Sequence, residues 1–217
     1  MARLKTAILI SGRGSNMQAL IESCRPPSAP AEIVLVLSNN AAAAGLDHAA
    51  KAGIPTAVID HRNCRDRAAF DAELDHHLRA AGIEFVCLAG FMRLLTLPFV
   101  ERWRDRMINV HPSLLPAFPG LDTHARALAA GVRFHGCTVH FVRFETDTGP
   151  IIVQAAVPVQ ADDRPDSLAA RVLAQEHRIY PQALAWVAEG RVRIERDRAI
   201  VAGAGVPPTV LISPSPT

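Results

Sequence analysis

The apolar positions of this chain follow two different spacings that alternate along its first half. Short runs rich in Val, Ile and Leu are separated by segments in which apolar residues recur at helical spacing, as at Phe70, Leu74 and Leu78. The runs are typical of buried strands, and the second spacing is typical of one helix face. We therefore expect strands at Thr6–Ser11, Glu32–Ser38, Thr56–Ile59 and Phe85–Ala89, and helices at Asn16–Ser23, Gly45–Ala52 and Ala68–Ala81. This alternation predicts an α/β fold, with a mostly parallel twisted sheet and helices on both faces.

The second half contains more proline and longer loops. The same criteria predict strands at Met107–Val110, Cys137–Phe141, Ile151–Val159 and Val192–Glu195, helices at Pro98–Asp105 and Ser167–Glu189, and a proline-rich loop at His111–His124. No clear boundary divides these elements, so we expect one domain over residues 1–200. Residues 201–217 contain four prolines and are predicted to form a loose, proline-rich C-terminal tail.

Composition and charge are those of an ordinary globular protein. Of the 217 residues, 49% are apolar and 20% are charged, which excludes a disordered chain. The 23 Lys and Arg exceed the 21 Asp and Glu by two, so a small molecule is a better expected partner than nucleic acid. The apolar runs are strand-sized and none resembles a signal peptide. We therefore expect no membrane partner and a cytoplasmic protein.

The cysteines and histidines do not have the spacing of a metal site. The four cysteines, Cys24, Cys64, Cys87 and Cys137, include no CxxC pair, and the nine histidines include no HExxH helix. We expect reduced thiols and no metal.

A glycine-containing loop follows the first predicted strand. Gly12-Arg13-Gly14-Ser15-Asn16 opens a helix, where free backbone N–H groups and the helix dipole form an anion site. A dinucleotide site would need a glycine in place of Met17, and a Walker A loop would need Gly-Lys-Ser or Gly-Lys-Thr. The loop therefore fits a single phosphate monoester better. The alternative is a glycine turn that caps the helix without any ligand.

Three polar residues form a second candidate site. Asn109 and His111 are two positions apart at the end of a strand, so their side chains share one face at the carboxyl edge of the sheet. That edge is where parallel sheets bind ligands. An amide beside an imidazole is suited to stabilise an oxyanion, and Asp147, in a turn before another strand, could orient the imidazole. The alternative is that these residues only cap or shape loops.

The wider sequence around these residues resembles a known family. Asn109-Val-His-Pro-Ser-Leu-Leu-Pro-Ala-Phe-Pro-Gly120 is similar to the signature of the folate-dependent formyltransferases. The resemblance continues in Ile10-Ser-Gly-Arg-Gly-Ser-Asn16, Leu88-Ala-Gly-Phe-Met-Arg93, His135-Gly-Cys-Thr-Val-His-Phe141 and Gln175-Glu-His-Arg-Ile-Tyr-Pro181. One departure is Thr148, where the family usually has a smaller residue. The resemblance implies a Rossmann-like sheet.

The resemblance also implies a role for each candidate residue. Asn109 would stabilise the oxyanion, His111 would act as general acid, and Asp147 would orient His111 and manage the proton. Gly14, Ser15 and Asn16 would hold a phosphate, with Glu176 near the ribose hydroxyls. The implied folate-binding residues are Arg67, Met92, Arg93, Leu94, Leu95, Asn109, Val142, Arg143, Phe144, Glu145 and Thr146.

The reaction implied is formyl transfer in de novo purine biosynthesis. The formyl group of 10-formyltetrahydrofolate, the co-substrate, would pass to the amine of glycinamide ribonucleotide without a metal. The products would be formylglycinamide ribonucleotide and tetrahydrofolate.

Three other functions would use parts of the same sequence. Methionyl-tRNA formyltransferase needs a further C-terminal domain and a basic surface, and formyltetrahydrofolate hydrolase usually adds an N-terminal regulatory domain. A non-catalytic nucleotide-binding module would leave Asn109, His111 and Asp147 unused.

Overall fold

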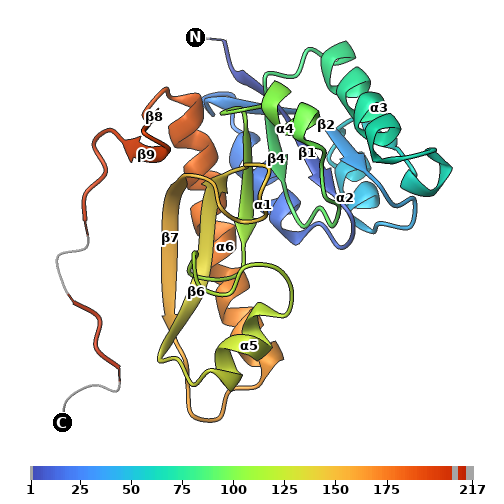
Figure 1. The fold of residues 1–217 in the computed structure, drawn as a ribbon. Helices are drawn as coiled ribbons and strands as arrows, with labels where there is room; N and C mark the ends of the chain where they lie inside the picture. Colours follow the sequence, from blue (N-terminus) through green and yellow to red (C-terminus); the bar gives the residue numbers. More distant parts are fainter. Residues whose placement is uncertain (1, 207–209, 214–217) are drawn as a thin grey trace.

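A computed structural model describes residues 2–206 and 210–213 and shows a seven-stranded sheet in the order β3-β2-β1-β4-β5-β6-β7 (Figure 1). The strands are β1 (Leu4–Ile10), β2 (Ala31–Ser38), β3 (Thr56–Val58), β4 (Phe85–Leu88), β5 (Met107–His111), β6 (Phe134–Phe141) and β7 (Ile151–Pro158). The first five strands pair in parallel. Strand β6 pairs antiparallel with both of its neighbours, β5 and β7. The predicted mostly parallel α/β fold is confirmed.

Helices cover both faces of this sheet, because the strands are apolar on both sides. In β1, Ile8 and Ile10 face one core, and Ala7 and Leu9 face the other. The first core is covered by α1 (Ser15–Cys24), α2 (Gly45–Lys51) and α6 (Pro165–Ala188), and the second by α3 (Arg67–Ala80) and α4 (Leu97–Arg102). The helix α5 (Thr123–Ala129) packs against α6 below β6 and β7 (Figure 1).

The described residues contain three elements that the sequence patterns did not predict: the helix α5, the short 3₁₀ helix η1 (His61–Asn63) and the strand β9 (Arg198–Val201). In addition, β6 begins three residues earlier than predicted. In β6 the misleading residue is Gly136, since glycine is unfavourable in strands. A Cβ atom there would lie 1.9 Å from the carbonyl oxygen of Ala155, so only glycine permits this approach of β7.

The carboxyl-terminal region also differs from its predicted boundaries. β9 pairs with the predicted strand β8 (Val192–Glu195), so Val201, the first residue of the predicted tail, belongs to a hairpin. Residues 202–206 and 210–213 have no regular secondary structure, which agrees with a loose tail. The rest of the predicted tail, residues 207–209 and 214–217, lies outside the described residues. The division into domain and tail remains a prediction.

The topology brings the carboxyl ends of β1, β4 and β5 to one edge. Strand order reverses between β1 and β4, and ligands of open α/β sheets bind at such a reversal. The glycine loop follows β1, and His111 is the last residue of β5. The fold thus places both candidate sites on one edge.

The structure also bears on two absences expected from the sequence. None of the helices in the described residues combines the length and apolar character needed to pass through a lipid bilayer. All four cysteines are among the described residues, and their thiols are free.

A buried tyrosine fastens α6 to the central strands. The Tyr180 hydroxyl donates to the carbonyl oxygens of Leu88 (2.9 Å) and Ile108 (3.2 Å), which end β4 and precede Asn109 in β5. Burial raises the pKa of this phenol well above its ordinary value, so the hydroxyl stays protonated and donates at neutral pH. One side chain therefore joins a helix to the two strands that carry the site.

We expect Tyr180→Phe to lower the free energy of unfolding by about 1–3 kcal/mol, because two buried carbonyl groups lose a hydrogen bond. Urea denaturation at neutral pH measures the change. Ser23→Ala, which removes a hydroxyl bonded within its own helix, serves as control and should cost less. Equal stability of Tyr180→Phe and the wild type would contradict this role of the hydroxyl.

Candidate active site

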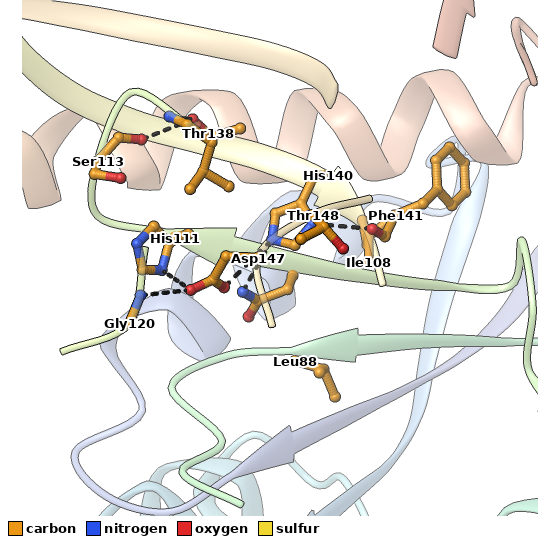
Figure 2. Close-up of polar contacts among 12 residues, drawn as sticks. Leu88, Ile108, His111, Ser113, Gly120, Thr138, His140, Phe141, Asp147 and Thr148 are labelled. Carbon is orange, nitrogen blue, oxygen red and sulfur yellow. Dashed lines mark hydrogen bonds and ion pairs between the residues drawn. The ribbon is translucent and has the colours of Figure 1, made fainter. Parts of the chain in front are cut away.

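The three predicted catalytic side chains lie in one cluster at the carboxyl end of β5. Figure 2 shows the Asp147 carboxylate facing His111. Asn109 and His111 share one face of β5, and Asp147 returns to them from the turn between β6 and β7. His111 Nδ1 lies 3.4 Å from Asp147 Oδ2, and both side chains are more than 90% buried. The antiparallel pair β6–β7 therefore supplies the carboxylate that β5 lacks.

The two nitrogens of His111 have different partners. Nε2 lies 3.0 Å from the carbonyl oxygen of Phe118, and a carbonyl oxygen can only accept, so we assign a hydrogen to Nε2. Nδ1 faces the Asp147 carboxylate at a distance longer than a hydrogen bond. The Nε2 bond therefore fixes the ring, and Nδ1 is the nitrogen left for a reacting group.

The turn that carries Asp147 is held in an unusual conformation. Asp147 has φ +59°, in the left-handed region, and its Oδ2 accepts a hydrogen bond from the backbone N–H of Gly120 at 2.8 Å. A Cβ atom on Gly149 would lie 1.8 Å from the carbonyl oxygen of Phe141, so the turn requires glycine there. The Thr148 hydroxyl donates to the carbonyl of Glu145 at 2.9 Å. The larger residue at position 148 is thus accommodated within the turn.

His140 is a member of this cluster that sequence reasoning did not assign. Its Nε2 lies 3.3 Å from Asn109 Nδ2, and its Nδ1 lies 2.9 Å from the carbonyl oxygen of Phe141. The carbonyl requires a hydrogen on Nδ1, which leaves Nε2 to accept from the amide. Burial lowers the pKa of His140, which favours this neutral form. His140 thereby orients the Asn109 amide.

A sequence signal for His140 did exist. His140 lies in the motif His135–Phe141. Where β5 and β6 pair, Asn109 is directly opposite His140. The antiparallel register, which was not predicted, would have placed the two side chains together.

The glycine loop forms an open helix N-terminus at the end of β1. Gly14 precedes α1 with φ +76°, and a Cβ atom there would lie 2.9 Å from Gly45 Cα. The backbone N–H of Gly45 donates to the carbonyl of Gly12 at 3.0 Å, which packs α2 against the loop. No side chain among the described residues caps α1. Its first N–H groups, from Ser15 onward, are therefore available to an anion.

Glu176 comes to the same place from α6. Its Oε2 accepts a hydrogen bond of 2.6 Å from Asn16 Nδ2, and the residue is 6% exposed. Burial raises the pKa of Glu176, against the opposing effects of the Asn16 hydrogen bond and the nearby His111. The structure thus brings together the predicted phosphate loop and the predicted ribose-binding carboxylate.

The predicted folate residues occupy several surfaces next to these sites. Met92, Leu94 and Phe144 are exposed apolar side chains, whereas Leu95 is buried. Arg67 begins α3 and is exposed, and the Arg93 guanidinium lies 4.8 Å from the centre of the Phe70 ring. Val142, Glu145 and Thr146 lie in the loop after β6.

Ser11 connects the glycine loop to this region, and sequence reasoning did not single it out. Its hydroxyl accepts from the backbone N–H of Met92 at 2.8 Å and donates to Asn39 Oδ1 at 2.6 Å. One hydroxyl therefore links the carboxyl ends of β1, β2 and β4.

The Arg143 side chain forms ion pairs with two aspartates. Its guanidinium donates to Asp105 (2.8 Å) and Asp197 (2.9 Å), and its side chain is 8% exposed. These two carboxylates engage the side chain, so a role in folate binding is left to the Arg143 backbone. The ion pairs instead fasten the loop to the β8–β9 hairpin.

This geometry can stabilise a tetrahedral oxyanion. The Asn109 amide and the His111 ring lie on one strand face, where the amide can donate and Nδ1 can donate whenever it carries a hydrogen, and the Asp147 carboxylate lies 3.4 Å from Nδ1. The described residues contain no cluster of His, Cys, Asp or Glu suited to a metal ion.

Comparisons with known proteins agree on one family. A family profile described as formyl transferase matches residues 4–184. The trifunctional purine biosynthetic protein adenosine-3 of Bos taurus is 54% identical over 88% of this chain, which spans only 19% of that protein's length. The phosphoribosylglycinamide formyltransferase of Escherichia coli (strain K12) is 44% identical over 94% of this chain and 97% of its own. The crystal structure of glycinamide ribonucleotide transformylase 1 from Symbiobacterium toebii is 47% identical, with a TM-score of 0.89 over 92% of this chain and 94% of its own.

The raised pKa of Glu176 makes a prediction about stability. In the folded protein the pKa of Glu176 lies above its ordinary value of 4.5, so this carboxyl group ionises more readily in the unfolded chain. Its ionisation therefore opposes folding. Glu176→Gln should therefore raise the melting temperature relative to wild type at pH 8, and the gain should disappear by pH 4. Calorimetry across this range, with exposed Glu32→Gln as control, measures it. A gain that does not depend on pH would contradict the explanation.

Proposed function

The chain belongs to the formyl transferase family, and from this premise we propose that it transfers the formyl group of 10-formyltetrahydrofolate to glycinamide ribonucleotide. The main support for this proposal is the position of the Asn109–His111–Asp147 cluster. It lies on the same sheet edge as the N-terminus of α1, which has no side-chain cap. The names of full-length relatives support this reaction, and it forms part of purine biosynthesis.

The chemistry follows from the positions of the donors. The amine of glycinamide ribonucleotide attacks the formyl carbon, a C–N bond forms, and the carbonyl oxygen becomes an oxyanion. Asn109 and His111 Nδ1 donate hydrogen bonds to this oxygen, and removing one such donor costs about 10²–10³ in rate. As the bond from carbon to folate N10 breaks, His111 gives a proton to N10, and the proton that the attacking nitrogen loses returns to His111. Asp147 keeps the imidazole oriented through both transfers.

Each substrate has a matching surface. The phosphate binds at the backbone N–H groups of Gly14, Ser15 and Asn16, and the ribose hydroxyls bind near Glu176. The folate packs on the apolar side chains of Met92, Leu94 and Phe144. Holding two reactants in line contributes up to about 7–11 kcal/mol to catalysis. The partners are therefore two small molecules, and the expected absence of nucleic-acid and membrane partners and a cytoplasmic location remain predictions.

We expect the purified protein to form formylglycinamide ribonucleotide from 10-formyltetrahydrofolate and glycinamide ribonucleotide without ATP and in the presence of EDTA. Product formation by mass spectrometry is the test, with water as the competing acceptor. His111→Ala should lower kcat by about 10²-fold or more, whereas exposed His76→Ala should not. Release of formate at an equal rate without the ribonucleotide would indicate a hydrolase instead.

The charge of Asp147 should matter more for kcat than for either KM. Asp147→Asn keeps an acceptor for Gly120 N–H but removes the charge beside His111, so we expect kcat to fall at least about 10²-fold. Steady-state kinetics with both substrates measure this, and exposed Asp162→Asn is the matched control. Near-normal kcat would show that Asp147 only shapes its turn.

A further inference from the structure

The backbone of the segment Phe118–Gly120 contacts both His111 and Asp147, the catalytic pair of the proposed reaction. The carbonyl of Phe118 accepts from His111 Nε2 at 3.0 Å, and the N–H of Gly120 donates to Asp147 Oδ2 at 2.8 Å. That carboxylate oxygen is the one 3.4 Å from His111 Nδ1 (Figure 2). The segment Phe118–Gly120 therefore sets the distance and angle between the imidazole and the carboxylate.

This segment has a conformation that needs external support. Phe118 has φ +54°, Gly120 +78° and Asp122 +55°, so three alternate residues are in the left-handed region. Residues other than glycine rarely adopt it, and it persists where surrounding contacts hold it. The Ser113 hydroxyl donates to the carbonyl of Ala117, but that contact ends before the segment begins.

Arg126 supplies the support. From the exposed side of α5, its Nη1 donates to the carbonyl oxygens of Pro119 (2.5 Å) and Leu121 (3.2 Å). Its guanidinium also lies over the Phe118 ring, 5.7 Å from the ring centre. Arg126 thus contacts the carbonyl groups of the two residues that flank Gly120 and the side chain of Phe118.

The arginine itself is firmly based. In α5, Thr123 and Ala127 are buried, and the helix packs against α6. The backbone N–H of Arg126 donates to the carbonyl of Asp122 at 3.0 Å, which fixes the spacing between the helix and the segment.

We propose that Arg126 is a positioning residue for the catalytic pair. Through the segment Phe118–Gly120, it fixes the position of His111 relative to Asp147. It touches neither His111 nor Asp147 and acts on both through the backbone. The proposal rests on the proposed formyl transfer for its kinetic consequence, and on the structure alone for its effect on Gly120.

Kinetics of Arg126→Ala provide the first test. Loss of the Arg126 contacts lets the pair drift, and small misplacements cost catalysis, so kcat should fall about 10- to 100-fold while both KM values change less than about twofold. Arg126→Lys should recover part of kcat, because an ammonium group reaches a carbonyl but cannot stack as a plane. The control is Arg133→Ala, which removes an exposed arginine side chain that follows α5 in the sequence. This variant should keep wild-type kcat.

Amide hydrogen exchange of Gly120, followed by NMR, provides a test without activity. Arg126→Ala should speed this exchange at least about tenfold, and Arg133→Ala should not. Unchanged kcat in Arg126→Ala, with or without a lower melting temperature, would overturn the proposal, as would unchanged exchange at Gly120. If the wild type transfers no formyl group, the proposed function fails, and the exchange at Gly120 alone decides whether Arg126 holds the pair.

Discussion

The buried carboxylate of Asp147 is the constraint on which the rest of the site depends. A carboxylate removed from water is costly unless donors and positive charge surround it. The chain provides a backbone N–H from the loop after β5 and an imidazole from β5 itself. The turn that brings Asp147 to these groups in turn requires the glycine at position 149 and a left-handed backbone at Asp147. The geometry of the predicted catalytic cluster thus depends on two loops that meet at one buried carboxylate.

The region of the glycine loop shows how binding and stability oppose each other. Burial raises the pKa of Glu176, so ionisation of this carboxyl group opposes folding. The side chain is nevertheless held against Asn16 at the predicted ribose position. The N-terminus of α1 likewise has no side-chain cap, so the helix lacks the stabilisation that such a cap provides. Natural sites often keep such unfavourable groups because a ligand completes their hydrogen bonds.

The sequence predicted the sheet, its helices and the meeting of Asn109, His111 and Asp147, because periodicity and strand-end positions are local or near-local signals. It missed what depends on register and on long-range contact. His140 is opposite Asn109 only because β6 returns antiparallel, and β6 begins early only because Gly136 admits the backbone of β7. The ion pairs of Arg143 with Asp105 and Asp197 likewise join residues distant in sequence and could not be read from local patterns. The helix α5 has little apolar periodicity and is stabilised mainly by packing.

The hydrogen bond between Asn16 and Glu176 joins residues 160 positions apart in the chain. Such a contact closes a loop that spans most of the molecule, and closing it becomes favourable only when the intervening elements have packed. During synthesis on the ribosome, the phosphate loop is made among the first residues but cannot gain this partner until α6 has emerged. A chain that ended before α6 would therefore lack this half of the predicted ribonucleotide site.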